Sequence, residues 1–313
     1  MLLTLEEQKE TLYASAQRAG LDITKDDITW QDGFVDIDGL KIHYLDWGTA
    51  GKPPMLLLHG GMQTAHTWDL VAVALKRNFH VVAMDLRGHG DSEWSADGDY
   101  NFTIHGKDAL ALVEQLGWDT FVLVGLSMGG LSAISVAADH WKQLSALVIV
   151  DVGPELKASG VGRILNFVRG PSELDSIDDF VQRALEHNPR RKPEQLRYSL
   201  THNLRQLPNG KWTWKYDQRF SQRSTQDGKE APAPPTDFKE LWKLLEAIEC
   251  PAIVIRGGDS QVLSEETGKK MESVMPNCRF VTVPKAGHTV PQDNASGFLA
   301  ELEPFLAELD VPS

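Results

Sequence analysis

The chain has 313 residues, of which 42% are hydrophobic, enough to bury one large α/β core with an insertion or two modest cores. Its 44 acidic and 31 basic residues give a net charge of −13, which argues against nucleic acid or an anionic membrane surface as a partner. The amino terminus lacks the basic and apolar segments of an export signal, and no apolar run reaches about 18 residues. We therefore predict a cytoplasmic protein that does not act at a membrane.

The first 30 residues are predicted to form a helical extension outside the main core. Thr4-Leu5-Glu6-Glu7 has the form of a capping box, and the helical pattern that follows it ends at Gly20. Residues 34–38 and 41–47 then alternate apolar and polar side chains on either side of Gly39. This alternation is typical of a hairpin at the edge of a sheet.

Five nearly continuous apolar runs follow, as expected of strands that are covered on both faces. They span residues 55–58, 80–84, 121–124, 146–150 and 252–255, and a last strand is predicted over 279–284. Segments with the length and spacing of helices separate the first four runs, and an amphipathic helix with Phe298, Leu302 and Phe305 ends the chain. Because parallel strands bury both faces under helices, this alternation predicts an α/β fold with a doubly wound, mostly parallel sheet.

Residues 153–235 interrupt the alternation. This segment is rich in Arg, Pro and Trp, has weak helical patterns over 177–186 and 193–204, and ends in the linker-like Ala-Pro-Ala-Pro-Pro of residues 231–235. It leaves after one core strand and returns before the next, so we interpret it as an inserted cap. The predicted core then comprises residues 31–152 and 236–313.

The central motif is a Gly-x-Ser-x-Gly pattern at residues 125–129. A β-branched apolar run precedes it and a small-residue helical pattern follows it, so Ser127 is predicted at the apex of a sharp strand-to-helix turn. Side chains at Gly125 and Gly129 would collide with the neighbouring strand and helix. Serine is a poor nucleophile at neutral pH, so Ser127 requires a general base, an acid that orients the base, and donors for an oxyanion.

Three further motifs accompany this turn. His59-Gly60-Gly61-Met62 follows the first apolar run, the loop 85–92 (DLRGHGDS) follows the second, and Gly287-His288 lies near the carboxyl terminus. In this order and spacing the motifs resemble the α/β-hydrolase superfamily, of the small esterase, lactonase and haloperoxidase-like kind, over roughly residues 32 to 309. The resemblance implies an α/β-hydrolase fold with an inserted helical cap, in which the loop 85–92 is a structural turn.

The resemblance also implies the base and the oxyanion donors. In the family the histidine lies on a loop after the last strand, where this chain has His288, and Gly287 lets that loop bend toward the serine. One oxyanion donor is the backbone N–H of Met128, directly after the nucleophile. The second is expected from the turn after the first apolar run, where Gly61 is preferred to Met62.

Two carboxylates compete for the role of the acid. Asp151 ends the strand that follows the nucleophile, which resembles related hydrolases that take their acid from this earlier strand. Asp259 ends the next strand, the commoner family position, but it lies one residue before the usual slot, which Ser260 occupies. A shift of one residue redirects a side chain, so we prefer Asp151 and keep Asp259 as the alternative.

These residues predict a serine hydrolase that cleaves a carboxylic ester-type bond through an acyl-enzyme. The sequence has neither a metal-binding motif nor a dinucleotide fingerprint, so no cofactor is expected. The expected partner is a small-molecule ester or lactone with an apolar moiety. Candidate pocket residues are Met62, His66, Trp68, Trp212, Trp214 and Tyr216. For Trp68, at the start of a helix, simple packing is the favoured alternative. Trp212, Trp214 and Tyr216 alternate, which places them on one face of a strand-like segment, where they are equally compatible with fastening the cap to the core.

Other activities are compatible with the same triad, namely lactone hydrolysis and carbon–carbon bond hydrolysis. Epoxide hydrolase and haloalkane dehalogenase chemistry is disfavoured, because those relatives carry Asp at the position of Ser127. A ligand receptor or scaffold that kept the fold and lost turnover is the alternative from another class. The complete set of serine, histidine and carboxylate argues against it.

Overall fold

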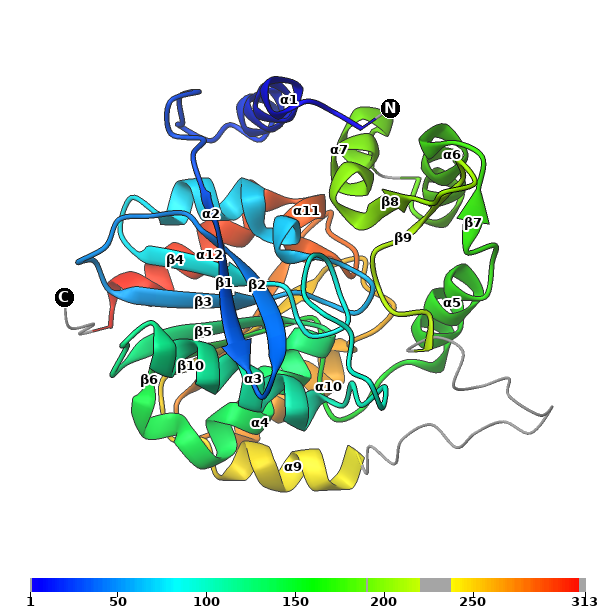
Figure 1. The fold of residues 1–313 in the computed structure, drawn as a ribbon. Helices are drawn as coiled ribbons and strands as arrows, with labels where there is room; N and C mark the ends of the chain where they lie inside the picture. The colour runs from blue at the N-terminus through cyan, green and yellow to red at the C-terminus, as the bar shows by residue number, and fades with distance from the viewer. Residues whose placement is uncertain (1, 190, 220–237, 310–313) are drawn as a thin grey trace.

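A computed structural model of the chain describes residues 2–189, 191–219 and 238–309 (Figure 1). At its centre is an eight-stranded sheet with the strand order β1-β2-β4-β3-β5-β6-β10-β11. The strands are β1 (Gln31–Ile37), β2 (Leu40–Asp46), β3 (Pro54–Leu58), β4 (His80–Met84), β5 (Phe121–Leu126), β6 (Leu144–Val150), β10 (Ala252–Gly257) and β11 (Cys278–Val283). The β1–β2 and β2–β4 pairs are antiparallel and the other pairs are parallel. The predicted mostly parallel sheet is therefore confirmed.

Helices cover both faces of this sheet, which is why its strands are apolar along their whole length. Neighbouring residues of β3 illustrate the arrangement, because Leu57 belongs to one hydrophobic cluster and Leu56 and Leu58 belong to the other. The first cluster includes side chains of α1 (Leu5–Arg18), α2 (Asp69–Leu75) and α12 (Ala295–Ala307). The second includes side chains of α3 (Phe102–Gln115), α4 (Met128–His140), α9 (Phe238–Glu246) and α10 (Glu265–Val274).

Helix α1 begins with the predicted capping box. The Thr4 hydroxyl accepts from the backbone N–H of Glu7 at 3.3 Å, and the Glu7 carboxylate accepts from the N–H of Thr4 at 2.7 Å. The sequence places this helix outside the main core, which is wrong, because Leu12 and Ala16 are buried in the same cluster as α2 and α12. Helix α1 also contacts α7 of the inserted segment.

The segment between β6 and α9, which we call the cap segment, forms a unit with its own hydrophobic cluster (Figure 1). It contains α5 (Ala158–Val168), β7 (Glu173–Leu174), α6 (Ile177–His187), α7 (Pro193–Asn203), β8 (Leu204–Gln206) and β9 (Trp212–Trp214). Helices α6 and α7 match the two predicted patterns, and β9 lies in the segment 212–216 that the alternating aromatic residues marked as strand-like, whereas α5, β7 and β8 were not predicted. The predicted cap boundary at residue 235 and the linker 231–235 lie outside the described residues, and the division of the chain into domains stays a prediction.

The loop 85–92 is organised by the buried carboxylate of Asp85. This carboxylate accepts from the backbone N–H groups of Ala65 (2.6 Å) and Asp91 (2.9 Å) and contacts His43 Nδ1 at 2.8 Å. A Cβ at Gly90, whose φ is +58°, would lie 2.1 Å from Asp85 Oδ2. Burial would raise the pKa of Asp85, but the contacts with His43 outweigh burial and hold the pKa well below its usual range. The carboxylate thus joins the turn after β3 to the loop after β4.

Short helices complete the described structure, namely η1 (Ala65–Trp68), η2 (Trp141–Gln143) and α11 (Val290–Asp293). None of the helices in the described part of the chain has the length and apolar character needed to cross a lipid bilayer.

Candidate active site

Ser127 is the single residue between β5 and α4. Its backbone has φ 53° and ψ −116°, a conformation that L-residues rarely adopt and that is held here by hydrogen bonds on both sides. Its N–H donates to Val150 O at 3.0 Å, and its carbonyl accepts from Leu131 N at 3.0 Å. The turn therefore fixes the serine side chain at the end of the central strand.

Gly125 and Gly129, two residues before and after Ser127, lie so close to neighbouring backbone that neither position has room for a side chain. A Cβ at Gly125 would lie 2.2 Å from Gly129 O, and a Cβ at Gly129 would lie 2.3 Å from Leu58 O. Both obstacles are backbone atoms, which cannot move aside as a flexible side chain would. The predicted steric reason for the Gly-x-Ser-x-Gly spacing is thus visible in the contacts.

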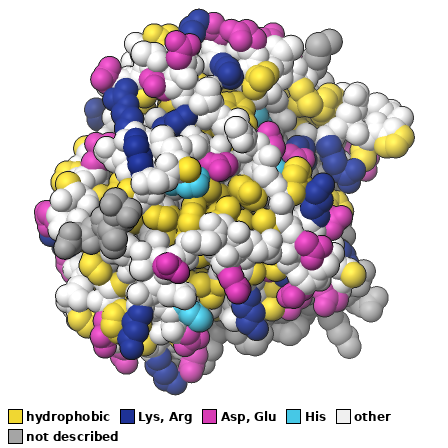
Figure 2. Space-filling model, turned by 60° about the vertical axis from the view of Figure 1, so that its left-hand side comes forward, with side chains coloured by type: hydrophobic (Ala, Val, Ile, Leu, Met, Phe, Trp, Pro, Cys, Tyr) yellow, Lys and Arg dark blue, Asp and Glu magenta, His cyan; other side chains and the backbone are white. Residues whose placement is uncertain are grey.

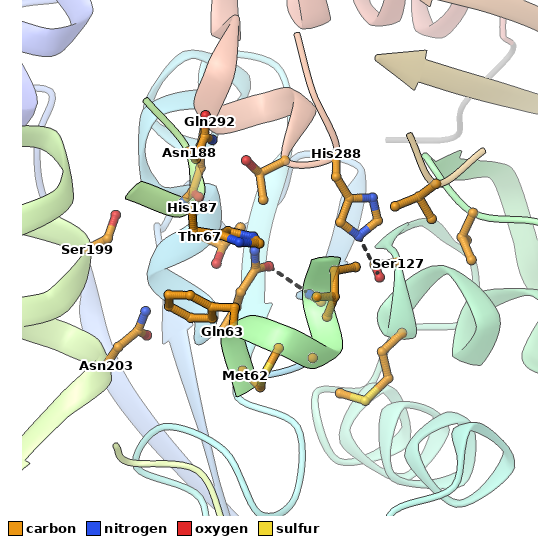
Figure 3. Close-up of a pocket in the computed structure, with 18 of the residues that line it drawn as sticks. Met62, Gln63, Thr67, Ser127, His187, Asn188, Ser199, Asn203, His288 and Gln292 are labelled. Atoms are coloured by element: carbon orange, nitrogen blue, oxygen red, sulfur yellow. Dashed lines mark hydrogen bonds between the residues drawn. The ribbon is translucent and has the colours of Figure 1, made fainter. Parts of the chain in front are cut away.

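A chain of hydrogen bonds runs from Ser127 through His288 to Asp151. His288 Nε2 lies 2.9 Å from Ser127 Oγ (Figure 3), and His288 Nδ1 lies 2.8 Å from Asp151 Oδ2. Asp151 directly follows β6 and is fully buried, whereas the His288 side chain is 22% exposed. Both distances fall in the range required for proton transfer or orientation. Three residues far apart in the sequence are brought together as a nucleophile, base and acid would be.

The carboxylate of Asp151 is held by β10 and the loop after it. Gly257 N donates to Asp151 Oδ1 at 3.0 Å, and Ser260 Oγ donates to Asp151 Oδ2 at 2.5 Å. Ser260 Oγ itself accepts from Val262 N at 3.0 Å. The side chain of Asp259, the alternative acid, is exposed, and its backbone N–H donates to Ala286 O. The residue in the commoner acid slot is thus a serine that orients the carboxylate of the preceding strand.

His288 lies on the loop between β11 and α11, as the resemblance implies. Asp293, the last residue of α11, fixes this loop by accepting from Gly287 N at 2.8 Å and from Thr289 Oγ1 at 3.1 Å. These two bonds flank His288 on both sides along the chain. The imidazole is therefore presented by a loop whose backbone is anchored.

The candidate oxyanion donors border the cavity next to Ser127. Gly61 and Met128 both line this cavity, and within the described residues neither backbone N–H has a hydrogen-bond acceptor. The neighbouring Gly60 N–H is instead engaged by Gln63 Oε1 at 3.0 Å (Figure 3). An amide that is free and borders the cavity can donate to a ligand, whereas the Gly60 amide cannot.

The side chain of His59 connects this turn to the loop after β4 by hydrogen bonds. It is fully buried, its Nε2 accepts from Leu86 N at 3.0 Å, and its Nδ1 lies 2.7 Å from Gly60 O. Because Nε2 is an acceptor, the ring proton is assigned to Nδ1, which donates to the Gly60 carbonyl. Burial lowers the pKa of His59, so the ring stays neutral and serves as a structural bridge between the two loops.

A cavity of about 830 Å³ lies over Ser127 and is bounded by both the core and the cap segment. Much of its lining is apolar, including Phe102, Leu131, Val152, Ile164, Phe167 and Val262. Its polar lining residues include Gln63, Thr67, His187, Asn188, Arg191, Ser199, Asn203 and Gln292, several of which are labelled in Figure 3. A hollow with hydrophobic side chains at its floor is visible on the face drawn in Figure 2. The cavity has the size and apolar character of a small-molecule site.

Two of the six predicted pocket residues, Met62 and Trp214, line this cavity. His66, Trp68, Trp212 and Tyr216 are not among the described residues that line it. Trp68 is fully buried in the core, where it packs on Phe298. For Trp68 the packing interpretation therefore fits the contacts.

The remaining three residues are also occupied elsewhere. His66 Nδ1 lies 2.8 Å from Asp69 Oδ2, and the His66 ring stacks on His202 with centroids 3.4 Å apart. Trp212 and Tyr216 are buried within the cap segment, and Tyr216 packs beside Trp214. Of the three alternating aromatic side chains, Trp214 alone lines the cavity in the described structure.

Two groups of side chains within the described residues have the composition of metal ligands, His66–Asp69–His202 and His43–Asp85–Asp91. In the first group the two imidazole rings are inclined by only 21°. Since the lone pair of an imidazole nitrogen lies in the ring plane, two nearly parallel stacked rings cannot both direct a lone pair at one ion. In the second group Asp85 already accepts two backbone N–H groups and contacts His43. Both arrangements fit hydrogen bonding better than metal ligation.

Several site residues were missed by sequence reasoning. Ser260 was noted only as the occupant of the acid slot, although its hydroxyl is a direct partner of Asp151. Arg191 lines the cavity but belongs to the sequence Arg-Arg-Lys, which has the pattern of an exposed basic run. Nothing in the local sequence marks its burial, because burial depends on how α6 and α7 pack over the core.

Comparisons with known proteins show the family to which the chain belongs. The family model described as alpha/beta hydrolase fold matches residues 53–295. The chain is 33% identical over 260 residues to the esterase Rv0045c of Mycobacterium tuberculosis, covering 80% of this chain and 82% of that protein. It is 30% identical over 256 residues to a 3-hydroxybutyrate-oligomer hydrolase of Cupriavidus necator, covering 79% and 87%.

Solved structures show the same fold over nearly the whole chain. A crystal structure of the Mycobacterium tuberculosis esterase has a TM-score of 0.76 at 29% identity and covers 97% of this chain and 99% of that one. An α/β hydrolase from Novosphingobium aromaticivorans has a TM-score of 0.73 at 27% identity, covering 89% and 98%. The expected fold class is confirmed by these matches. The chain belongs to the α/β-hydrolase family and is a hydrolase.

Proposed function

We propose that this hydrolase cleaves carboxylic ester-type bonds, with Ser127 as nucleophile, His288 as general base and Asp151 as the acid that orients it. The observation that carries the proposal is the pair of distances, 2.9 Å from Ser127 Oγ to His288 Nε2 and 2.8 Å from His288 Nδ1 to Asp151 Oδ2. The similarity to an esterase and to a 3-hydroxybutyrate-oligomer hydrolase supports an ester-type substrate. A cytoplasmic location and the lack of a cofactor are part of the proposal and rest on the sequence.

The first half of the reaction forms an acyl-enzyme. His288 Nε2 takes the hydroxyl proton as Ser127 Oγ attacks the carbonyl carbon, and Asp151 stabilises the resulting imidazolium through Nδ1. The carbonyl oxygen becomes an oxyanion that accepts from the N–H groups of Gly61 and Met128. When the tetrahedral intermediate collapses, the proton on Nε2 passes to the departing alcohol.

The second half releases the acid. A water molecule gives a proton to His288 Nε2 and attacks the acyl carbon, and the same two N–H groups hold the new oxyanion. Collapse returns the proton to Ser127 Oγ and frees the carboxylic acid. The apolar part of the cavity suits an apolar portion of the substrate.

Replacement of Ser127 tests the proposal. We expect Ser127→Ala to lower kcat for an aryl ester by about 10⁴- to 10⁶-fold, because the nucleophile and base act as a unit. A fluorophosphonate probe should label the native enzyme at Ser127 and leave the variant unlabelled. Ser132→Ala is the matched control, because Ser132 lies on α4 and its hydroxyl donates to the backbone carbonyl of Met128. Retention of more than a tenth of the activity in Ser127→Ala would refute the assignment.

A substrate panel separates ester hydrolysis from the two alternatives on the same triad. Aryl esters, lactones and vinylogous diketones should each be measured with the native enzyme and with Ser127→Ala. We expect the highest Ser127-dependent kcat/KM with the esters. A higher value with lactones or with the diketones would replace the proposed reaction with lactone or carbon–carbon bond hydrolysis.

A further inference from the structure

Arg191 is a basic side chain that lines the cavity over Ser127 from the connection between α6 and α7. Its Nη2 donates to Ser199 Oγ at 2.8 Å and to Gln195 O at 3.3 Å, and its Nη1 donates to Gln292 Oε1 at 3.3 Å. All three acceptors are uncharged. The guanidinium is thus positioned by neutral groups from the cap segment and from α11.

The positive charge of Arg191 has no carboxylate partner among the described residues. The structure records no ion pair for it in the described part of the chain, and the described lining of the cavity includes neither Asp nor Glu. Asp293 acts on Arg191 only at a distance, and its carboxylate already accepts from Gly287 N and Thr289 Oγ1. Burial lowers the pKa of Arg191, although an arginine stays protonated in proteins.

A buried charge without an opposite charge is costly to desolvate, so such charges are normally paired. The side chain of Arg191 is partly accessible, and it borders the cavity, so a ligand can reach it. Two of its positioning partners show where it acts. In the view of Figure 3, Ser199 and Gln292 lie apart from Ser127 and His288, across the drawn part of the cavity. A ligand anion at Arg191 would therefore be held away from the reacting carbonyl.

We propose that the substrate is an ester that carries a carboxylate, and that Arg191 binds this carboxylate while the ester carbonyl lies at Ser127. The inference rests on the proposed function and adds the substrate class. The cavity then has two parts with different tasks, an apolar lining that accepts the body of the substrate and a cationic group that fixes its far end. Arginine suits this task because its planar fork matches a carboxylate in geometry and charge.

Matched ester pairs test the inference. The first series uses mono-4-nitrophenyl esters of straight-chain dicarboxylic acids, each paired with the same ester whose far carboxylate is blocked as a primary amide. The second series places the carboxylate on the leaving group, with acyloxybenzoates paired with the corresponding acyloxybenzamides. The measured quantity is the ratio of kcat/KM for the charged ester to kcat/KM for its amide. We expect a ratio above one for the native enzyme in at least one series.

Two variants test whether Arg191 causes the preference for the charged ester. Arg191→Gln keeps amide donors but removes the charge, and we expect it to lower this ratio by about 10- to 100-fold, as for loss of a hydrogen bond to a charged group. The control is Arg197→Gln, because Arg197 lies on α7, pairs with Asp178 on α6 and is not among the described residues that line the cavity. Arg197→Gln should leave the ratio unchanged. An equal fall in both variants, or no fall in Arg191→Gln, overturns the inference.

Inhibition of the native enzyme gives a second readout if Arg191→Gln does not fold. We expect free dicarboxylates to compete with a neutral aryl ester more strongly than their monoamides do. Equal inhibition by both, together with a ratio of one or less in both ester series, overturns the inference. Ser127-dependent turnover of neutral esters under those conditions would leave the proposed function intact, whereas turnover that survives Ser127→Ala would remove both.

Discussion

Ser260 and Gly257 hold the carboxylate of Asp151 from β10 and the loop after it, at 2.5 and 3.0 Å. The serine hydroxyl reaches Asp151 Oδ2, the oxygen that also contacts His288 Nδ1. Its position in the chain is the slot in which related hydrolases commonly carry the acid itself. The same location after the strand can therefore supply either the carboxylate or a donor that orients a carboxylate from the neighbouring strand.

Exchanging each aspartate for asparagine distinguishes the two candidate acids. We expect Asp151→Asn to lower kcat for an aryl ester by about 10⁴-fold, because the amide would direct an N–H at His288 Nδ1, which favours the wrong imidazole tautomer and no longer stabilises the imidazolium. Asp259→Asn should change kcat by less than about threefold, since the Asp259 side chain is exposed. The assignment of Asp151 is wrong if only Asp259→Asn collapses the activity.

Two arguments separated the candidates in the sequence: the offset of Asp259 from the usual slot, and the resemblance of Asp151 to the acid that some related hydrolases carry after the earlier strand. The positive φ of Asp151 (52°) and its fully buried carboxylate carry no sequence signal. A local pattern places a residue at the end of a strand, but its side-chain direction depends on the backbone of that residue and on its neighbours. This is why the sequence leaves two candidates, Asp151 and Asp259, for the acid.

At the scale of elements, the turn from β5 into α4 depends on the close approach of α4 to the end of β3. The N–H of Gly129 donates to His59 O at 3.1 Å, so the first turn of the helix is bonded to the turn that carries Gly61. The proposed nucleophile, Ser127, and the two proposed oxyanion donors are therefore linked through backbone contacts. A change in the helix position would move all three together.

A methyl group at Gly129 should break this arrangement. Its Cβ would lie 2.3 Å from Leu58 O and 2.6 Å from His59 O, both backbone atoms, so we expect Gly129→Ala to lower the free energy of unfolding by about 1 to 3 kcal/mol or more. Gly162→Ala is the control, because Gly162 lies in α5 with nothing within 4 Å of an added Cβ. That variant should be neutral or more stable by about 0.5 to 1 kcal/mol. Urea unfolding measures both, and equal stability of the two variants would contradict the steric argument.

The parallel strands of the core were predictable to within one or two residues at each end. Residues 80–84 coincide with β4, and the predicted run 252–255 lies inside β10, because strands covered on both faces are continuously apolar. In the β7-β9-β8 sheet of the cap segment, the alternation of Trp212, Trp214 and Tyr216 indicated β9. The strands β7 and β8, of two and three residues, are too short to show a period of two and were not predictable.

At the scale of the whole molecule, several histidines are buried as neutral rings. Burial lowers the pKa of His59, His89, His105 and His202, in the case of His89 to about 3. Between the lowered pKa of the folded state and the ordinary value near 6.5, the unfolded chain binds protons that the folded chain cannot. The stability contributed by these rings is complete above about pH 6.5 and is lost as the pH falls.

The pKa of His43 is shifted in the opposite direction, so its effect on the pH dependence of stability is also opposite. Burial lowers its pKa, but the hydrogen bonds and charge of Asp85 and Asp32 outweigh burial, so the pKa is raised. The contribution of His43 to the free energy of unfolding is complete below the ordinary histidine pKa and is lost as the pH rises through the raised pKa of the folded state. Burial also lowers the pKa of His187, so five histidines with lowered pKa values stand against one with a raised pKa, and we predict a net loss of stability between pH 7 and pH 5.

His105 provides the sharpest test, because it is fully buried and neither ring nitrogen has a hydrogen-bond partner in the described structure. We expect His105→Leu to make the free energy of unfolding less dependent on pH, by up to about 1.4 kcal/mol per pH unit between pH 6.5 and 5. His140→Gln, at an exposed position, should leave the slope unchanged. Urea unfolding at several pH values measures the slopes, and an unchanged slope in His105→Leu would contradict the expectation.

The polar part of the cavity shows the limit of sequence reasoning at this scale. Arg191 comes from the connection before α7, Ser199 from α7 and Gln292 from α11, and none of the three belongs to a recognisable motif. Their proximity is a result of tertiary packing, as is the absence of acidic side chains around them in the described lining. The sequence singled out Ser127 by the glycines that its sharp turn requires and His288 by the family resemblance, whereas no local pattern marks the residues that line the cavity from the cap segment.

The positions of these residues along the chain have a consequence for how the enzyme can change over generations. Ser127, Asp151 and His288 follow strands of the central sheet, whereas Arg191 lies farther along the chain, in the connection between α6 and α7 of the cap segment. Under the proposed roles, inherited substitutions confined to α6, α7 and their connection alter which molecules are accepted and leave the proposed nucleophile, base and acid in place. The range of accepted substrates can therefore change during evolution while the reaction itself stays the same.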